Sequence, residues 1–135
     1  MILVDSSVII DVVQADSVGG DWSRAALTDA AESAALAINP VIYAEISVSF
    51  STIDLQEDVF QPLSLRRLPL PYVAGFLAGK AHLDYRRRGG ARTSPMPDFY
   101  IGAHAAAEKL ALLTRDPRWY ARYFPTVRLI APEVG

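Results

Sequence analysis

Residues 1–14 read MILVDSSVIIDVVQ, and this stretch decides the fold class. Ile2 to Val4 is a short, wholly apolar run that stops at Asp5, a pattern typical of a buried strand. The segment from about Ser7 to Gln14 then predicts a helix with a polar residue at its start. A buried strand that leads directly into a helix is the unit from which α/β folds with parallel sheets are built.

The same alternation of short apolar runs and helical segments continues to the end of the chain. Further strands are predicted at residues 35–38, 63–68, 111–114 and 127–130. Further helices are predicted at residues 22–33, 40–50, 54–60, 71–88, 98–110 and 116–123. Asp21 is a candidate cap of the helix at 22–33, residues 16–21 form a predicted loop, and Asn39-Pro40 resembles a helix start. We therefore expect one domain over residues 1–135, a three-layer α/β/α sandwich with a mainly parallel central sheet.

Composition excludes several classes of site. The chain has no cysteine, which excludes a thiolate zinc site, a thiol nucleophile and a disulfide framework. Apolar residues make up 51% of the sequence, enough for a core without such supports. The apolar stretch from Ile2 to Val13 is interrupted by Asp5 and Asp11, so we expect neither a signal peptide nor a membrane span, but a cytoplasmic protein.

The charges are distributed unevenly along the chain. The net charge is −2, yet Arg24 is the only basic residue among the first 62. The other twelve basic residues follow, and a basic face is compatible with this distribution. The densest group is Arg86, Arg87 and Arg88, with Arg92 beyond two glycines. It is a candidate contact for an RNA backbone, while the alternative is a helix end that favours cations.

Acidic residues follow the predicted strands. Asp5 comes directly after the first strand, and Asp116 follows the strand at 111–114. Because ligands bind beyond the carboxyl ends of parallel strands, both aspartates are expected at one sheet edge. Glu45 lies in the second turn of a helix that starts at the same edge, and Asp98 opens a later helix.

These acids have alternative interpretations. Asp5, Asp98 and Asp116 each stand at a predicted helix start, where aspartate is a favoured cap. Glu45 lies on an apolar helical arc that also holds Ala44, Ile46 and Val48, where a salt bridge to an arginine is the alternative to a metal. Four acids at one edge are nevertheless harder to explain as caps, since a Mg²⁺ or Mn²⁺ ion relieves the repulsion between them.

Four segments together carry a resemblance to a known family: Asp5-Ser6-Ser7 after an apolar strand, residues 39–45 (NPVIYAE), residues 97–105 (PDFYIGAHA) and residues 113–116 (LTRD). In this order, over nearly the whole chain, they resemble the PIN domain family and are most similar to the VapC-type toxins of type II toxin–antitoxin systems. Each segment is a weak signal alone, but the ordered set is specific.

The resemblance implies a function and a site. It implies a Mg²⁺- or Mn²⁺-dependent endoribonuclease, a homodimer, and inhibition by a cognate antitoxin protein. The family's three principal acids correspond to Asp5, Glu45 and Asp98, and its fourth corresponds to Asp116. The hydroxyls of Ser6 and Thr114 match positions that support the metal site in such domains.

Other residues with functional chemistry have simpler interpretations. Asp11 is expected to face solvent, and His104 is expected to pack as an ordinary histidine. The aromatic residues after Asp116 are Trp119, Tyr120, Tyr123 and Phe124. They are candidates for stacking on bases, but core or dimer packing is favoured for a short helix.

Two other functions compete with hydrolysis of RNA. Phosphoryl transfer to an aspartate is set aside. A haloacid-dehalogenase-type phosphatase needs a second aspartate two residues after the first, and position 7 is serine. A response-regulator receiver needs a lysine at a late strand, and the two lysines, Lys80 and Lys109, lie on predicted helices. The remaining alternative is a non-catalytic PIN-like module that only binds RNA or protein. Such a module is favoured by loss of an acid, and none of the four is lost.

Overall fold

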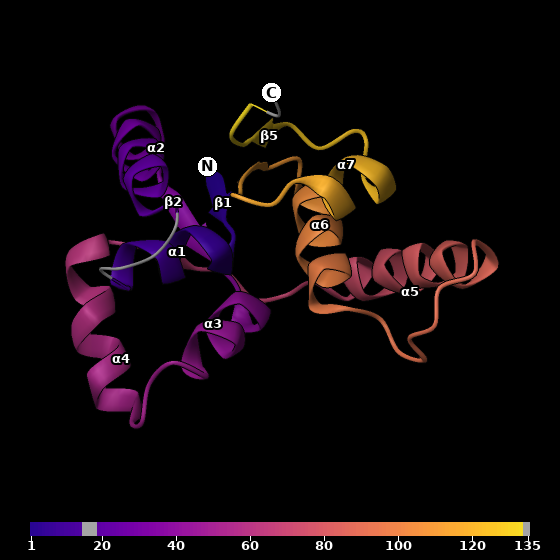
Figure 1. Ribbon diagram of the computed structural model, residues 1–135, viewed down its shortest axis with the longest axis horizontal. Helices are drawn as coiled ribbons and strands as arrows, with labels where there is room; N and C mark the ends of the chain where they lie inside the picture. Colours follow the sequence, from indigo (N-terminus) through magenta and orange to yellow (C-terminus); the bar gives the residue numbers. More distant parts are fainter. Residues whose placement is uncertain (15–18, 134–135) are drawn as a thin grey trace.

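A five-stranded parallel sheet forms the centre of the molecule, in the order β3-β2-β1-β4-β5. The structure is a computed structural model, and it describes residues 1–14 and 19–133 (Figure 1). The strands are β1 (Ile2–Val4), β2 (Leu36–Ile38), β3 (Arg66–Arg67), β4 (Ala111–Leu113) and β5 (Leu129–Ile130). All residues of β1 and β2 are buried, as expected for strands covered on both faces.

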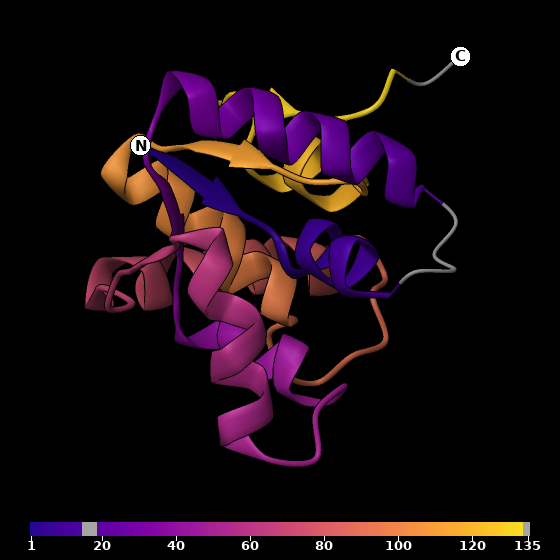
Figure 2. The same cartoon turned by 90° about the vertical axis from the view of Figure 1, so that its left-hand side faces the viewer.

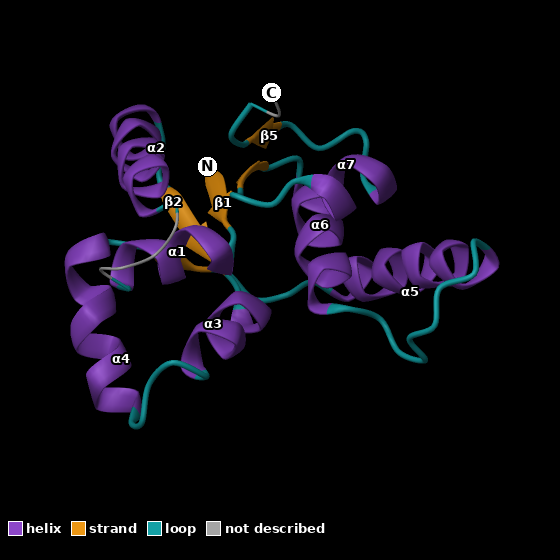
Figure 3. Cartoon of the chain, in the orientation of Figure 1, coloured by secondary structure: helices purple, strands orange, loops and turns teal. Residues whose placement is uncertain are grey.

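Helices cover both faces of this sheet. They are α1 (Ser6–Val13), α2 (Gly20–Ser33), α3 (Pro40–Ser47), α4 (Ile53–Phe60), α5 (Tyr72–Arg87), α6 (Pro97–Glu108) and α7 (Arg118–Tyr123). Figure 1 shows α1, α2 and α4 on one side of the strands and α5, α6 and α7 on the other; the turned view in Figure 2 and the colouring in Figure 3 show the same layers. The predicted α/β/α sandwich is therefore confirmed. Within the described residues, no helix is long and apolar enough to cross a membrane.

The strand order places a topological switch point at β1. Both neighbours of β1 in the sheet, β2 and β4, are parallel to it, and the chain leaves β1 in one direction and returns on its other side. Loops that leave the carboxyl ends of two such strands diverge to opposite faces and open a site between them. The segments that follow β1, β2 and β4 therefore meet at one edge.

Some predicted boundaries were wrong. The second helix begins at Gly20, so the predicted cap Asp21 lies in the first turn and pairs with Arg24 at 2.7 Å. Gly19, at φ 100°, occupies the cap position. Glycine adopts this left-handed backbone conformation at low cost, because it has no Cβ atom. Of the predicted loop at 16–21, residues 16–18 lie outside the described residues. The strand predicted at 63–68 is reduced to β3, because residues 61–63 form a 3₁₀ turn.

Close packing between α6 and α7 holds two site-bearing elements together. Gly102 is buried on α6 beneath the ring of Phe124, which directly follows α7. A Cβ atom added at Gly102 would overlap that ring. The absence of a side chain at this position therefore sets the distance between the two helices.

We expect Gly102→Ala to lower the free energy of unfolding by about 1–3 kcal/mol, because the added methyl overpacks the contact with Phe124. The matched control is Gly79→Ala on α5, where a Cβ meets no atom within 4 Å. That change should raise stability by about 0.5–1 kcal/mol, the usual gain of alanine over glycine in a helix. Urea unfolding of both variants measures the difference, and equal effects would contradict the packing argument.

Candidate metal centre

Asp5 is held at the end of β1 by contacts from three segments. Its backbone N–H donates to Leu113 O at 2.8 Å, which extends the β1–β4 ladder by one residue. Its Oδ2 accepts from Ser7 Oγ at 2.9 Å and from Thr114 Oγ1 at 2.8 Å. Its Oδ1 accepts from the Tyr120 hydroxyl at 3.1 Å. The Asp5 side chain is buried, and hydrogen-bond donors on both of its oxygens fix its orientation.

Glu45 approaches from the second turn of α3. This helix starts as predicted: Asn39 Oδ1 accepts from the Ile42 N–H at 2.9 Å, and Pro40 occupies the first helical position. Glu45 Oε1 accepts from Ser6 Oγ at 2.9 Å. The salt bridge to an arginine, the alternative for Glu45, is absent among the described residues.

The predicted apolar arc around Glu45 was partly wrong. Ile42 and Ile46 are buried, but Ala44 is exposed and Val48 is 89% exposed. Because α3 is short and lies near the sheet edge, only one narrow face of it meets the core. Glu45 stands at the border of that face and is half-buried.

Asp98 completes the group from the first turn of α6. It is half-buried, and its Oδ1 accepts from the Tyr120 hydroxyl at 3.3 Å. One carboxylate oxygen from each of Asp5, Glu45 and Asp98 lies within 4.8 Å of the others. Residues separated by up to 93 positions in the sequence are thus brought to one point, at the sheet edge where they were expected.

Burial is the main cause of the raised pKa values of these three carboxylates. Burial raises the pKa of Glu45 to about 7, with further contributions from the charges of Asp5 and Asp98. Burial and the charge of Asp5 raise the pKa of Asp98 to about 6. Burial also raises the pKa of Asp5, although the Thr114, Ser7 and Tyr120 hydroxyls oppose it. Among the described residues these three carboxylates form no ion pair with a cationic side chain, and such a concentration of negative charge fits a hard divalent ion with oxygen ligands.

Asp116 lies beside this group and not within it. Among the described residues, the convergent acids are Asp5, Glu45 and Asp98. The Asp116 side chain is exposed, and its Oδ1 accepts from Arg118 Nε at 3.3 Å. Its charge nevertheless contributes to the raised pKa of Asp98. Asp116 is therefore close enough to act electrostatically on the centre.

The capping alternative for the three aspartates does not hold. Asp5 occupies the cap position of α1, but its side chain makes no capping hydrogen bond. Asp98 lies inside the first turn of α6, whose cap is Met96. α7 begins after Asp116, with Pro117 at its cap. The carboxylates therefore remain available for other contacts.

Sequence reasoning missed two hydroxyls and misplaced one acid. Ser7 and Tyr120 both donate to Asp5, whereas Tyr120 was assigned only to packing or stacking. A signal was present, since a buried tyrosine requires a partner for its hydroxyl. Asp11, expected to face solvent, is buried and accepts from Ser23 Oγ at 2.7 Å and Arg115 Nε at 3.0 Å. This pair connects α1 to the loop that carries Thr114 and Asp116.

His104 is an ordinary packed histidine, as expected. It is fully buried on α6 and lies 3.0 Å from Asn39 Nδ2 through its Nδ1 and 2.9 Å from Glu108 Oε2 through its Nε2. Since Asn39 Nδ2 is a donor, Nδ1 accepts and Nε2 donates. Nδ1 thus supports the start of α3 through Asn39, while Nε2 bonds Glu108 on α6 itself.

The predicted arginine cluster occupies the end of α5 and the loop that leads to α6. Arg86 Nη1 donates to the carbonyls of Ala91 and Arg92 at 3.3 and 2.9 Å, so it stabilises the loop. Arg88 Nε donates to Asp84 at 3.2 Å. Arg87 and Arg92 are exposed, and Arg92 is close enough to lower the pKa of Asp98. Of the four arginines, Arg92 is the one whose charge acts on the acidic group.

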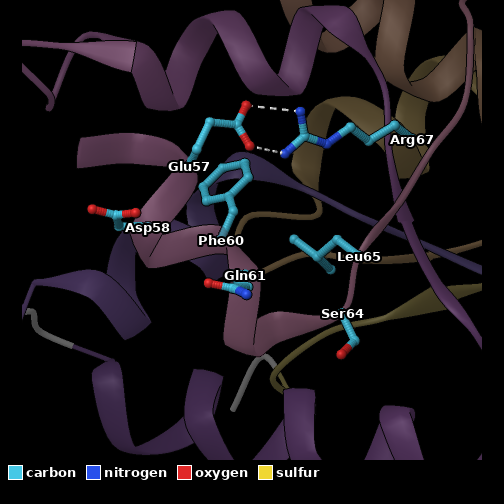
Figure 4. Close-up of a pocket in the computed structure, with 7 residues that line it drawn as sticks. All are labelled: Glu57, Asp58, Phe60, Gln61, Ser64, Leu65 and Arg67. Carbon is cyan, nitrogen blue, oxygen red and sulfur yellow. Dashed lines mark hydrogen bonds and ion pairs between the residues drawn. The ribbon is translucent and has the colours of Figure 1, made fainter. Parts of the chain in front are cut away.

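A hollow between α4 and β3 lies apart from this centre. Its volume is about 390 Å³, and Figure 4 shows Glu57 and Arg67 joined by two ion-pair contacts at its rim. Arg67 and the Tyr43 hydroxyl lower the pKa of Glu57 to about 2. None of the acids of the centre lines the hollow, and the ion pair there connects α4 to the edge strand.

Comparisons with known proteins agree with this architecture. The sequence matches the family model described as PIN domain over residues 2–125. No curated protein sequence matches the chain. Its fold is similar to the crystal structure of VapBC2 from Rickettsia felis bound to a DNA fragment from their promoter, with a TM-score of 0.74, 17% identity and coverage of 98% of this chain and 100% of that chain.

Two further solved structures share the fold. FitAcB from Neisseria gonorrhoeae matches with a TM-score of 0.70 and 21% identity, over 96% of each chain. VapBC-1 from nontypeable Haemophilus influenzae matches with a TM-score of 0.72 and 14% identity, over 97% of this chain and 98% of that chain. At these identities the similarity establishes a common fold.

Proposed function

This chain belongs to the PIN domain family, and from that premise we propose that it is a divalent-metal-dependent endoribonuclease that hydrolyses RNA phosphodiester bonds. The observation that carries the proposal is the convergence of Asp5, Glu45 and Asp98 within 4.8 Å. We assign Mg²⁺ or Mn²⁺ to these three side chains, since both ions prefer carboxylate oxygens. Asp116 is assigned a supporting electrostatic role at the same centre.

Each residue has a defined part in the proposed reaction. When bound, the ion would polarise phosphate oxygens and lower the pKa of water. Ser6 holds Oε1 of Glu45, while Oε2 has no hydrogen-bond donor among the described residues. Oε2 is therefore the atom we propose to accept a proton from the attacking water. Thr114 and Ser7 keep Asp5 in place through Oδ2.

The direct test separates catalysis from binding. Purified protein is incubated with RNA and with DNA of the same sequence, in Mg²⁺, in Mn²⁺ and in a chelator, and the ends of the products are sequenced. New RNA ends that require the metal support the proposal. Equal RNA binding with and without metal, and no new ends, would instead favour the non-catalytic PIN-like module.

We also propose a biological context, the toxin of a type II toxin–antitoxin pair with a cognate antitoxin and a homodimeric form. Support comes from the similar solved structures, one of which is a toxin–antitoxin complex from Klebsiella pneumoniae. Exposed apolar side chains on α5, among them Tyr72 at 99% and Phe76 at 63%, offer a surface for a second copy. Growth arrest on expression alone, relieved by the product of a neighbouring gene, tests the toxin role; sedimentation at micromolar concentration tests the dimer.

We expect Arg92→Gln to weaken RNA binding, because its charge lies near Asp98 and it forms no ion pair among the described residues. In metal-free buffer, the slope of the logarithm of RNA affinity against the logarithm of salt concentration should become less steep by about 0.7. This is the value for one lost phosphate contact on a single strand. The control is Arg128→Gln. This exposed arginine directly precedes β5, so it lies at the amino ends of the strands, whereas the acids lie at the carboxyl ends.

Replacing Arg86, Arg87 and Arg88 together with glutamine extends the same test. Their proposed phosphate contacts should lower the salt slope by about 2 if all three reach RNA. A smaller change is expected, because Arg86 and Arg88 already bind the loop and Asp84. A wild-type slope in both the triple variant and Arg92→Gln would show that these arginines do not contact RNA.

A further inference from the structure

The hydroxyl of Tyr120 is shared by two of the three convergent carboxylates. It lies 3.1 Å from Asp5 Oδ1 and 3.3 Å from Asp98 Oδ1. The side chain is 1% exposed, so the ring is enclosed in the core while its polar end reaches the acidic group. The phenol oxygen thus links the end of β1 to the first turn of α6.

The arrangement limits the movement of both carboxylates. Asp5 is already held at Oδ2 by Ser7 and Thr114, so Tyr120 supplies the donor on its second oxygen. For Asp98, Tyr120 is the only hydrogen-bond donor among the described residues. Without the phenol, Asp5 would keep two donors, whereas Asp98 would be free to change rotamer. Loss of the hydroxyl should therefore act mainly on the position of Asp98.

We propose that Tyr120 is a positioning residue that holds the Asp98 carboxylate against Asp5, in the spacing a divalent ion requires. The inference rests on the proposed function, since it assigns the same three acids to the ion. Hydrogen-bond partners behind metal ligands orient those ligands, and their loss typically costs about 10–100-fold in metal affinity. Tyr120 acts through the aspartates and is not assigned a contact with RNA.

The experiment measures Mn²⁺ binding in the absence of RNA. Tyr120→Phe, Tyr123→Phe, Asp98→Asn and wild type are titrated with Mn²⁺ at about pH 8, above the pKa values of Glu45 and Asp98. Free Mn²⁺ is measured by electron paramagnetic resonance. We expect Tyr120→Phe to bind about 10–100-fold more weakly. Tyr123→Phe is the matched control, since it loses a hydroxyl from the same helix that makes no hydrogen bond among the described residues. It should bind as wild type does.

Thermal unfolding in a chelator tests the folding of each variant. The phenylalanine ring fills the same space, so Tyr120→Phe should still unfold cooperatively. A purely structural role would lower the unfolding temperature and leave Mn²⁺ affinity unchanged, and that result overturns the inference. Unchanged or tighter Mn²⁺ binding in Tyr120→Phe, with binding lost in Asp98→Asn, refutes the tyrosine's role alone. Wild-type binding in Asp98→Asn refutes the metal centre and this inference with it.

Discussion

Asp98→Asn should reduce metal-dependent RNA cleavage by at least about 1,000-fold. The estimate follows from the loss of about 4 kcal/mol of transition-state stabilisation, a share of the several kcal/mol that a bound ion supplies, at 1.36 kcal/mol per factor of ten. Asparagine keeps the shape of the side chain and can still accept from Tyr120, but it removes a charge from the convergent group. A fluorogenic RNA assay in Mg²⁺ and Mn²⁺ measures the rate, and circular dichroism confirms the fold.

Two further variants calibrate this result. Asp116→Asn should have a much smaller effect, because the Asp116 carboxylate is exposed, pairs with Arg118 and lies outside the convergent group. Asp29→Asn, an exposed acid on α2, should cleave as wild type does. Full activity in Asp98→Asn would refute metal catalysis at this centre, while equal losses in Asp116→Asn and Asp98→Asn would show that the centre includes four acids on equal terms.

The second large effect concerns pH and stability without metal. In the folded protein the pKa values are raised to about 7 for Glu45 and about 6 for Asp98, from 4.5 and 3.8. Between about pH 4 and pH 7 the folded state therefore binds more protons than the unfolded state, so stability falls as pH rises. We expect a loss of about 1–2 kcal/mol, less than the full 1.36 kcal/mol per pKa unit because both side chains are partly solvated.

Divalent ions should reverse this loss. The carboxylates must be deprotonated to bind the ion, so stabilisation by Mn²⁺ should be small near pH 5 and large near pH 8. At 100 times its Kd, the ion contributes about 2.7 kcal/mol, or a rise in Tm of roughly 5–15 °C for a domain of this size. Thermal unfolding with Mn²⁺ or a chelator across this pH range measures both effects.

Glu45→Gln provides the matched variant for the pH experiment. It removes the carboxyl group whose pKa is raised to about 7, and it keeps an oxygen that can accept from the Ser6 hydroxyl. Without metal near pH 8 it should be more stable than wild type, because a repulsive charge is gone. It should also respond less to Mn²⁺. A metal-free wild type whose stability rises steadily from pH 4 to pH 7 would contradict the assignment of these pKa shifts.

Local sequence signals determined much of this protein. The apolar run before Asp5 predicted a buried strand, and Asn39-Pro40 predicted the start of α3 with its capping hydrogen bond. The order of strands and helices indicated a parallel sheet, whose carboxyl edge then located Asp5 and Glu45. These signals are readable because a strand's burial and a helix's start depend on neighbouring residues, within a few positions of each other.

Which side chains are in contact could be seen only in the folded molecule. Tyr120 reaches Asp5 across 115 positions, and Asp11 meets Arg115 across a similar span. Such contacts depend on strand order and on how closely α6 and α7 pack, which no local period encodes. In the same structure Asp116 pairs with Arg118 and lies outside the group of three convergent acids. Residue order and local pattern located the acids at the carboxyl edge of the sheet. Packing between distant segments brought three of them to one point, because chain topology and not residue type sets those distances.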